Sequence, residues 1–440
     1  MASDSDDAYT PESERLRREI GTFGAAMMGL GSIIGTGVFV SIGIAAGVTG
    51  PSVVLAVVIG ALVATFNGLS SAQLAANHPV SGGTYEYGYR YLNSWLGFTA
   101  GWLFLLAKSA SAATAALGFA GYALALVSQE GRAWHVALAL ALIVILTLLV
   151  LTGIRRSNRA NIIIVSVTLA SLAFFVLAGL PVALGEGTAN FFPFFAPEEG
   201  RGTLSALLYA SALMFVAYTG YGRIATLGEE VREPRVTIPR AIIIALVAVM
   251  VIYLLVTLVG VGVAGADELA DAQNRAAPLE AAARRLRVGP APVVLAVGAV
   301  TAMVGVLLNL ILGLSRVLLA MGRRRDMPAV FGRLDRTGST PTAAVIAVGV
   351  LIGLLATTGN VRTTWSFSAF TVLVYYAITN LAALTLPEEG RYYPRWVAVA
   401  GLLSCLLLAF FVERQILLTG MALVGLGLLW HAVARRKRMT

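Results

Sequence analysis

The sequence predicts an all-α polytopic membrane protein with twelve transmembrane helices, and two observations lead to this fold class. First, hydrophobic residues make up 58% and charged residues only 12% of the 440 residues, against about 45–50% and about 25% in an ordinary soluble domain. Second, Asp, Glu, Lys and Arg are absent from Ile20 to Tyr85 and from several later runs of membrane-spanning length. These runs do not alternate apolar and polar residues, so they predict helices and not the strands of a β-barrel.

The uncharged runs divide the chain into spans joined mostly by short polar loops. The predicted spans are 22–44, 50–76, 95–127, 134–152, 161–184, 203–228, 240–264, 291–321, 342–358, 363–386, 396–412 and 416–433. One loop, 267–289, is longer, and its segment Pro278–Ala283 predicts a short surface helix. Residues 1–19 lack an apolar stretch beside a cleavage site, so they predict a polar tail and not a secretory signal.

The net charge of +9 follows from membrane orientation. Arginines concentrate in loops on the side of both termini, as at Arg155, Arg156 and 323–325. The positive-inside rule therefore predicts cytoplasmic termini, in a multi-pass protein of the cell (plasma) membrane. Because the arginines are scattered over short loops, they form no nucleic-acid patch. The bilayer is an expected partner, and nucleic acid is not.

Glycines interrupt the first and the sixth predicted helix, at residues 29–37 and 215–222. Each glycine costs a helix about 1 kcal/mol relative to alanine. Gly31 and Gly35 also fit a small-residue packing pair. However, two Gly-interrupted helices, five apart in order, are typical of a transporter site in a five-plus-five inverted repeat.

Unwound segments expose backbone N–H and C=O groups that the bilayer cannot satisfy. A zwitterion can satisfy both kinds, with its carboxylate at the N–H groups of a half-helix N-terminus and its ammonium at the freed carbonyls. The breaks thus predict a site for a small zwitterion. Neither break contains an acid to pair with a cationic side chain, so neutral and fairly small side chains are expected.

The chain resembles the amino acid–polyamine–organocation superfamily, in particular its bacterial and archaeal amino-acid permeases. The motifs that carry the resemblance, in order along nearly the whole chain, are 31–39, 79–85, 215–221, 228–240 and 315–323. The resemblance implies the leucine-transporter fold, with discontinuous helices 1 and 6 and alternating access around a central site. The implied division of the chain is a cytoplasmic tail 1–19, inverted repeats 20–184 and 203–386, two accessory helices 396–434 and a cytoplasmic tail 435–440.

The resemblance also implies site residues in the two breaks. The implied substrate-binding residues are Ile33, Gly35, Thr36, Gly37, Phe215, Val216, Ala217 and Thr219. The amides of 35–37 would hold the carboxylate of an amino-acid substrate, and carbonyls from both breaks would hold its α-ammonium. Phe215 and Val216 would face or gate the side chain. The implied function is secondary-active amino-acid transport, for which we predict proton symport; an amino-acid or polyamine exchanger or uniporter, and sodium-coupled symport, remain alternatives.

The coupling ion is where the sequence departs from many relatives. They carry a lysine in helix five, seven residues after the asparagine that resembles Asn161; here that position is Thr168. In those relatives the lysine stands in for a sodium ion and takes part in proton coupling. Lys108, in the third span, is the only lysine before Lys437. A buried lysine can lose its proton, whereas arginine stays charged. We therefore predict proton coupling at Lys108, with snorkelling to headgroups and a sodium site at Thr168 as the alternatives.

Other function classes lack the residues they need. An intramembrane enzyme requires a nucleophile–base pair and a channel requires rings of polar residues, and neither pattern is present. His78, His135 and His431 fall near predicted membrane surfaces, which fits interfacial side chains. Most of the six tryptophans, Trp365 among them, sit near span ends, as in an aromatic belt. No His, Cys, Asp or Glu cluster has metal-ligand spacing. No catalytic residue, metal or cofactor is expected; an amino-acid sensor without transport remains an alternative.

Overall fold

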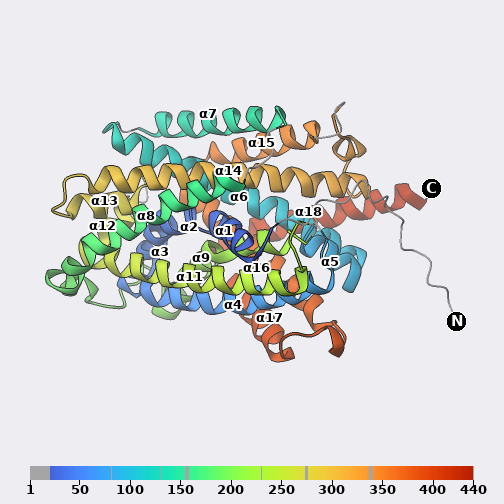
Figure 1. The fold of residues 1–440 in the computed structure, drawn as a ribbon, viewed down its shortest axis with the longest axis horizontal. Coiled ribbons are helices and arrows are strands. Elements are labelled where there is room, and N and C mark those ends of the chain that lie inside the picture. The colour runs from blue at the N-terminus through green and yellow to red at the C-terminus, as the bar shows by residue number, and fades with distance from the viewer. Residues whose placement is uncertain are drawn as a thin grey trace.

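The structure is a computed structural model that describes residues 20–80, 82–129, 131–153, 158–228, 230–272, 276–335 and 340–439. The predicted tail 1–19 lies outside these residues. Long helices run side by side along the longest axis of the molecule (Figure 1). Within the described ranges the one β-type pairing is a parallel bridge between Ile20 and Val231, so the predicted all-α class is confirmed.

Helices cover every predicted span. The helices that supply them are α1 (Thr22–Ile33) with α2 (Thr36–Phe39) and α3 (Ser41–Thr49), α4 (Val53–Asn77), α6 (Ser94–Leu126), α7 (Arg132–Leu151), α8 (Asn158–Leu184), α9 (Thr203–Tyr218) with α10 (Gly222–Ala225), α11 (Pro234–Ala264), α14 (Ala291–Arg323), α15 (Thr342–Ala356), α16 (Val361–Leu384), α17 (Arg395–Phe410) and α18 (Arg414–Met439). Ten segments of the described residues are long and apolar enough to cross a membrane, and α15 and α17 are shorter apolar helices. This pattern is consistent with the twelve predicted spans.

Shorter elements lie between the spans. They are the α-helices α5 (Thr84–Tyr91), α12 (Ala266–Asp271) and α13 (Pro278–Arg285), and the 3-10 turns Gly50–Ser52, Glu186–Phe191, Thr219–Tyr221, Ala329–Gly332 and Glu388–Gly390. The helix predicted at Pro278–Ala283 forms as α13, but its position at the surface was predicted wrongly, because these six residues are buried and pack against neighbouring helices. The division of the spans into two inverted repeats stays a prediction.

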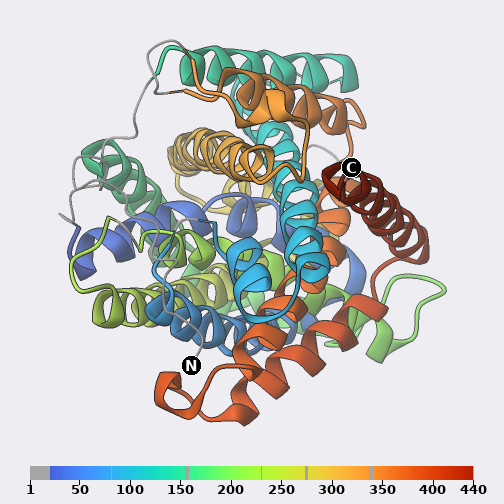
Figure 2. The same cartoon turned by 90° about the vertical axis from the view of Figure 1, so that its right-hand side faces the viewer.

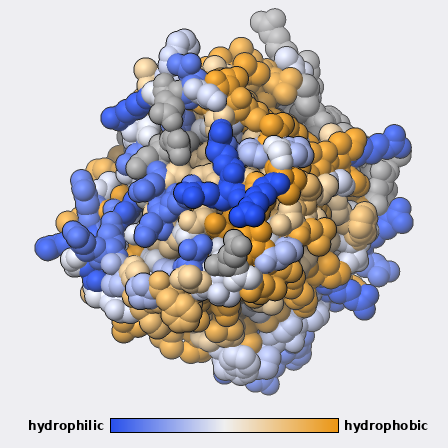
Figure 3. Space-filling model, turned by 90° about the vertical axis from the view of Figure 1, so that its left-hand side faces the viewer, coloured by the Kyte–Doolittle hydropathy of each residue, from blue (hydrophilic) through white to orange (hydrophobic). Residues whose placement is uncertain are grey.

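The outer helices present apolar side chains to their surroundings. On α7, for example, Val144, Ile145 and Leu148 are each more than half exposed. So large an apolar surface would be unfavourable in water and indicates contact with lipid. At the end of the molecule where α12 and α13 lie, hydrophilic residues run from the centre of the view to its left edge, and hydrophobic residues cover much of the rest (Figure 3). The molecule is therefore a multi-pass membrane protein.

The two interrupted helices lie at the centre of the bundle. Viewed along the helices, α7, α15, α17 and α18 lie along the edges (Figure 2), whereas most residues of α1 and α9 are buried. The chain leaves helical geometry at Ile34, which is extended (φ −79°, ψ 106°), and re-enters at Thr36. In the sixth span a 3-10 turn separates α9 from α10. The predicted discontinuity of helices 1 and 6 is confirmed.

Candidate functional site

The two breaks contact each other backbone to backbone. At Gly220 an added Cβ would lie 2.6 Å from the Ile33 nitrogen and closer still to the Ser32 carbonyl. At Gly37 a Cβ would lie 2.7 Å from the Cβ of Ala217. Real Cβ atoms essentially never approach other heavy atoms below 3.0 Å. Glycine is therefore required at both positions for this close approach, which fixes the two breaks against each other.

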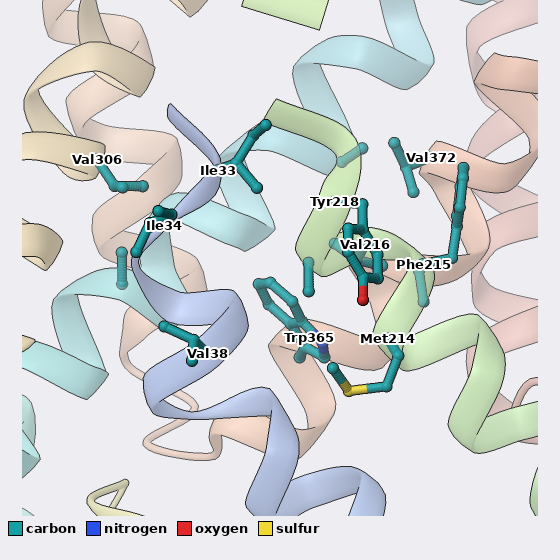
Figure 4. Close-up of a cluster of buried hydrophobic side chains, with 14 of the residues drawn as sticks. Ile33, Ile34, Val38, Met214, Phe215, Val216, Tyr218, Val306, Trp365 and Val372 are labelled. Atoms are coloured by element: carbon teal, nitrogen blue, oxygen red, sulfur yellow. The ribbon is translucent and has the colours of Figure 1, made fainter. Parts of the chain in front are cut away.

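A cavity of about 40 Å³ lies where the breaks meet. Its lining residues are Ser32, Ile33, Thr36, Gly37, Lys108, Ser111, Val216, Ala217, Thr219, Gly220, Val306, Leu310 and Trp365. Because a water molecule needs about 10–15 Å³ of such volume, the cavity holds a few small groups. Trp365 lies between the first broken helix and α9, and Ile34 lies beside Val306 (Figure 4).

The structure brings six of the eight predicted substrate-binding residues to this cavity. The six are Ile33, Thr36, Gly37, Val216, Ala217 and Thr219. Gly35 does not line it and instead faces Val306, whose Cγ2 would lie 2.6 Å from an added Cβ. Phe215 does not line it either. It is fully buried, and its ring packs edge-on against Tyr376, with centroids 5.7 Å apart.

Side-chain hydroxyls donate to the carbonyls that were expected to hold an ammonium group. Tyr253 Oη lies 2.8 Å from Ile33 O and 3.3 Å from Ala217 O, Thr219 Oγ1 lies 2.8 Å from Val216 O, and Tyr376 Oη lies 3.2 Å from Thr219 O. Tyr253 extends from α11 and Tyr376 from α16. The unwound carbonyls thus have partners inside the protein, as a non-aqueous environment requires.

Unpaired donors remain at the first break. The hydrogen bonds of the described residues give no protein acceptor to the N–H groups of Gly35, Thr36 and Gly37. The Thr36 hydroxyl, 4% exposed, likewise has no partner among them. Buried donors without acceptors are uncommon and call for a ligand or water. A carboxylate has the oxygen atoms to accept from these groups.

Lys108 places a positive charge at the same cavity. Its Nζ donates to Thr219 Oγ1 at 2.9 Å, and it lines the cavity from α6. Within the described residues no carboxylate lies within 4.0 Å of Nζ, the limit for an ion pair. This geometry differs from a side chain that snorkels to headgroups, because Lys108 points into the centre of the bundle.

Thr168 has a different environment. Its hydroxyl donates to the Ile164 carbonyl at 2.9 Å, within α8, and Ser171 Oγ donates to the Thr168 carbonyl at 2.8 Å. Thr168 is not among the residues that line the cavity. Its side chain is therefore engaged with its own helix.

An ion-pair network closes the end of the molecule at which α12 and α13 lie. Arg362, at the start of α16, donates to both oxygens of Glu198 at 2.7 and 2.8 Å and to Glu413 Oε1 at 2.9 Å. Tyr209 Oη, on α9, lies 3.0 Å from Glu413 Oε1. The Arg362 guanidinium beside Glu198 holds the pKa of that carboxyl below its ordinary value. Trp365, one turn further along α16, covers the cavity beneath this network.

The cavity continues toward the opposite end. A second cavity of about 130 Å³ shares Ser32, Lys108 and Thr219 with the first and extends to Arg223 and Arg316. The candidate site is thus closed at the α12–α13 end and hollow toward the end at which α5 and the end of α18 lie.

Sequence reasoning missed several residues of the site. Trp365 lies near the start of α16, as expected of a residue near a span end, but its part in the site was not foreseen: it is 3% exposed, and its Nε1 donates to the Leu213 carbonyl at 3.0 Å. Tyr253 and Tyr376 were not singled out. Each is a tyrosine within an apolar span, and its hydroxyl could have identified it, because a buried hydroxyl needs a hydrogen-bond partner.

The sequence pattern of the family described as "Amino acid permease" matches residues 24–435. An uncharacterized transporter of Mycobacterium tuberculosis is 40% identical over 96% of this chain and 92% of its own length. The branched-chain amino acid permease of Bacillus subtilis is 28% identical over 88% of this chain and 85% of its own. Among solved structures, a mutant manganese transporter of Eremococcus coleocola has a similar fold, with a TM-score of 0.64 at 14% identity, over 98% of this chain and all of that chain.

Proposed function

The chain belongs to the amino acid permease family, and from this premise we propose that it is a proton-coupled symporter of neutral amino acids that works by alternating access. The observation that carries the proposal is the cavity between the two breaks, with unpaired amides, the unpartnered Thr36 hydroxyl and the Lys108 ammonium around it. We place the protein in the cell membrane with both termini in the cytoplasm, following the arginine distribution.

In this proposal the amino-acid carboxylate binds the N–H groups of residues 35–37 and the Thr36 hydroxyl. The α-ammonium binds carbonyls of both breaks and replaces the hydroxyls of Tyr253 and Tyr376 as their donor. Ile33, Val216, Ala217 and Thr219 supply those carbonyls, as the family resemblance implies. Phe215 packs against Tyr376, and Gly35 lets Val306 approach the backbone closely between α1 and α2.

Lys108 provides a physical basis for proton coupling. When the cavity closes, a protonated Lys108 without a counter-ion is costly, because a buried charge requires a partner. A substrate carboxylate in the same cavity supplies that partner. Proton and amino acid therefore stabilise each other in the closed state, and release of one favours release of the other. An arginine could not act in this way, since it does not deprotonate.

Lys108 also bears on the class of substrate. A cationic side chain in the cavity would be repelled by its ammonium, and neither break supplies an acid to offset that repulsion. The lining residues Val216, Val306 and Leu310 are apolar. Neutral side chains fit these surroundings, and the Bacillus subtilis relative is named as a permease for branched-chain amino acids, which are neutral.

The test is uptake by proteoliposomes of a panel of amino acids under an inward proton gradient. We expect the wild type to accumulate neutral amino acids above equilibrium. Lys108→Ala should lose this accumulation but retain exchange of labelled for unlabelled amino acid. Lys108→Arg, which keeps the charge but cannot release it, should lose it as well.

Three outcomes would contradict parts of the proposal. Undiminished proton-driven accumulation by Lys108→Ala would remove Lys108 from the coupling mechanism. Accumulation driven by sodium and not by protons would favour a sodium-coupled symporter and make Thr168 the next residue to test. Uptake that requires amino acid inside the liposomes would identify an exchanger.

A further inference from the structure

The larger cavity contains charged residues that the proposed central site does not use. Arg223 on α10, Arg316 on α14 and Glu230 after α10 all line it. Arg223 follows directly after the second break. Arg316 is ten residues beyond Val306, which lines the central cavity, and so lies about 15 Å further along the helix at 1.5 Å per residue. An amino-acid backbone cannot span that distance.

The two arginines reach the cavity from different elements. On α14 the lining residues Asn309, Gly313 and Arg316 are four and three apart, the spacing of one helix face. Arg316 is exposed and Arg223 is half-buried. Both side chains line the hollow.

The guanidinium groups lack strong partners of their own. Among the described residues, the side chain of Arg223 makes one hydrogen bond, a long one of 3.4 Å from Nη1 to Thr226 Oγ1. Within the described residues neither arginine has a carboxylate within 4.0 Å. Two like charges that face one cavity repel each other, and Glu230, which lines the same cavity, forms no ion pair with either. A ligand carboxylate between the arginines would offset their repulsion, since arginine binds carboxylates with two parallel hydrogen bonds.

We propose that Arg223, Arg316 and Glu230 form a second amino-acid binding station on the cytoplasmic side of the central site. The arginines bind the carboxylate, and Glu230 binds the α-ammonium. The two stations share one cavity, in which Ser32, Lys108, Thr219, Gly220, Val306 and Leu310 line both parts. A substrate that leaves the breaks passes to the second station before it reaches water. This inference rests on the proposed function, because it takes an amino acid as the ligand.

The experiment is equilibrium dialysis of the purified full-length protein against the amino acid that binds most tightly in a panel of the twenty proteinogenic L-amino acids, with radiolabel. We expect two amino acids bound per wild-type chain. Arg223→Gln and Arg316→Gln should each leave one bound at low concentration and weaken the second at least about tenfold, because hydrogen bonds to charged groups are the strong ones. Arg323→Gln, on the same helix but outside the cavity lining, is the matched control and should bind two.

Two further measurements separate the explanations. Glu230→Gln should lower the affinity of the second station for the amino acid but not its affinity for acetate. If acetate displaces the second amino acid from the wild type as well as an unlabelled amino acid does, the station is a simple anion site and the zwitterion assignment is overturned. One bound amino acid in the wild type, with normal affinity in both arginine variants, would overturn the second station and leave the proposed function standing. No binding of any amino acid by the wild type would overturn both.

Discussion

The contact between the two breaks gives the most direct prediction, for the substitution Gly220→Ala. The added methyl carbon would lie 2.6 Å from the Ile33 nitrogen, and the Ser32 carbonyl is closer still. Ordinary contacts of a Cβ lie at 3.4–4 Å, so the breaks must separate by about 1 Å. All of the close atoms belong to the backbone, and no rotation of a side chain can relieve the clash.

The magnitude follows from this geometry. Overpacking in a well-packed interior costs about 1–3 kcal/mol. If the cost falls on the closed, substrate-bound arrangement, in which both breaks contact the amino acid, affinity falls by roughly 5- to 150-fold at about 1.4 kcal/mol per factor of ten. If the cost falls on the whole fold, the free energy of unfolding decreases by the same amount, a substantial part of the about 5–15 kcal/mol by which native proteins are usually stable.

The assays are amino-acid binding by scintillation proximity and thermal unfolding in detergent, each on the same preparation. Gly425→Ala on α18 is the control, because nothing lies within 4 Å of its added Cβ. Alanine there should leave binding unchanged and slightly stabilise the helix. A Gly220→Ala protein that binds within twofold of wild type and unfolds at the wild-type temperature would refute the inference that the breaks touch here.

Three further predictions concern polar groups around the site. Tyr253→Phe removes the hydroxyl that lies on both breaks and should lower the free energy of unfolding by about 1–3 kcal/mol, measured by thermal unfolding; no change would mean that the carbonyls have other donors. Thr219→Val removes the partner of Lys108 and should alter the pH dependence of uptake more than substrate affinity, measured as KM and kcat across pH. Arg362 holds the pKa of the Glu198 carboxyl below its ordinary value. The ionised carboxylate therefore stabilises the fold above the ordinary carboxyl range, about pH 4–5, and this stability is lost as the pH falls through the lowered pKa. Glu198→Gln should lose less stability than the wild type over that pH interval, measured by thermal unfolding across pH.

Most of the fold could be predicted because the bilayer imposes it. Backbone groups in lipid must be satisfied internally, so long uncharged runs such as 50–76 had to form helices, and α4 (Val53–Asn77) does. The two breaks were visible because glycine is unfavourable inside a helix. The residues at which the helices break could not be predicted exactly. The helix α1 ends at Ile33, inside a glycine-rich stretch in which the sequence does not distinguish this position from its neighbours.

The site residues that lie in the two breaks could be predicted from the sequence, whereas those that reach the site from other helices could not. Thr36 and Thr219 lie in the breaks and were found from the sequence. Tyr253 and Trp365 come from α11 and α16, and their approach depends on how those helices pack. Gly37 shows a further limit: the resemblance implies that its amide holds the carboxylate, and only the structure shows that Ala217 packs against it.

The hydroxyls at the breaks have a consequence for binding affinity. In the structure the freed carbonyls already accept hydrogen bonds from Tyr253, Thr219 and Tyr376. An arriving ammonium must exchange places with some of these donors, so it gains only the difference between a charged and a neutral hydrogen bond, which is modest. The amides of residues 35–37 and the Thr36 hydroxyl have no such partners, and a carboxylate there gains whole hydrogen bonds. The carboxylate should therefore supply more of the binding free energy than the ammonium. A transporter that must release its substrate benefits from this division, because the hydroxyls can return to the carbonyls as the ammonium leaves and no buried acceptor is left unpaired.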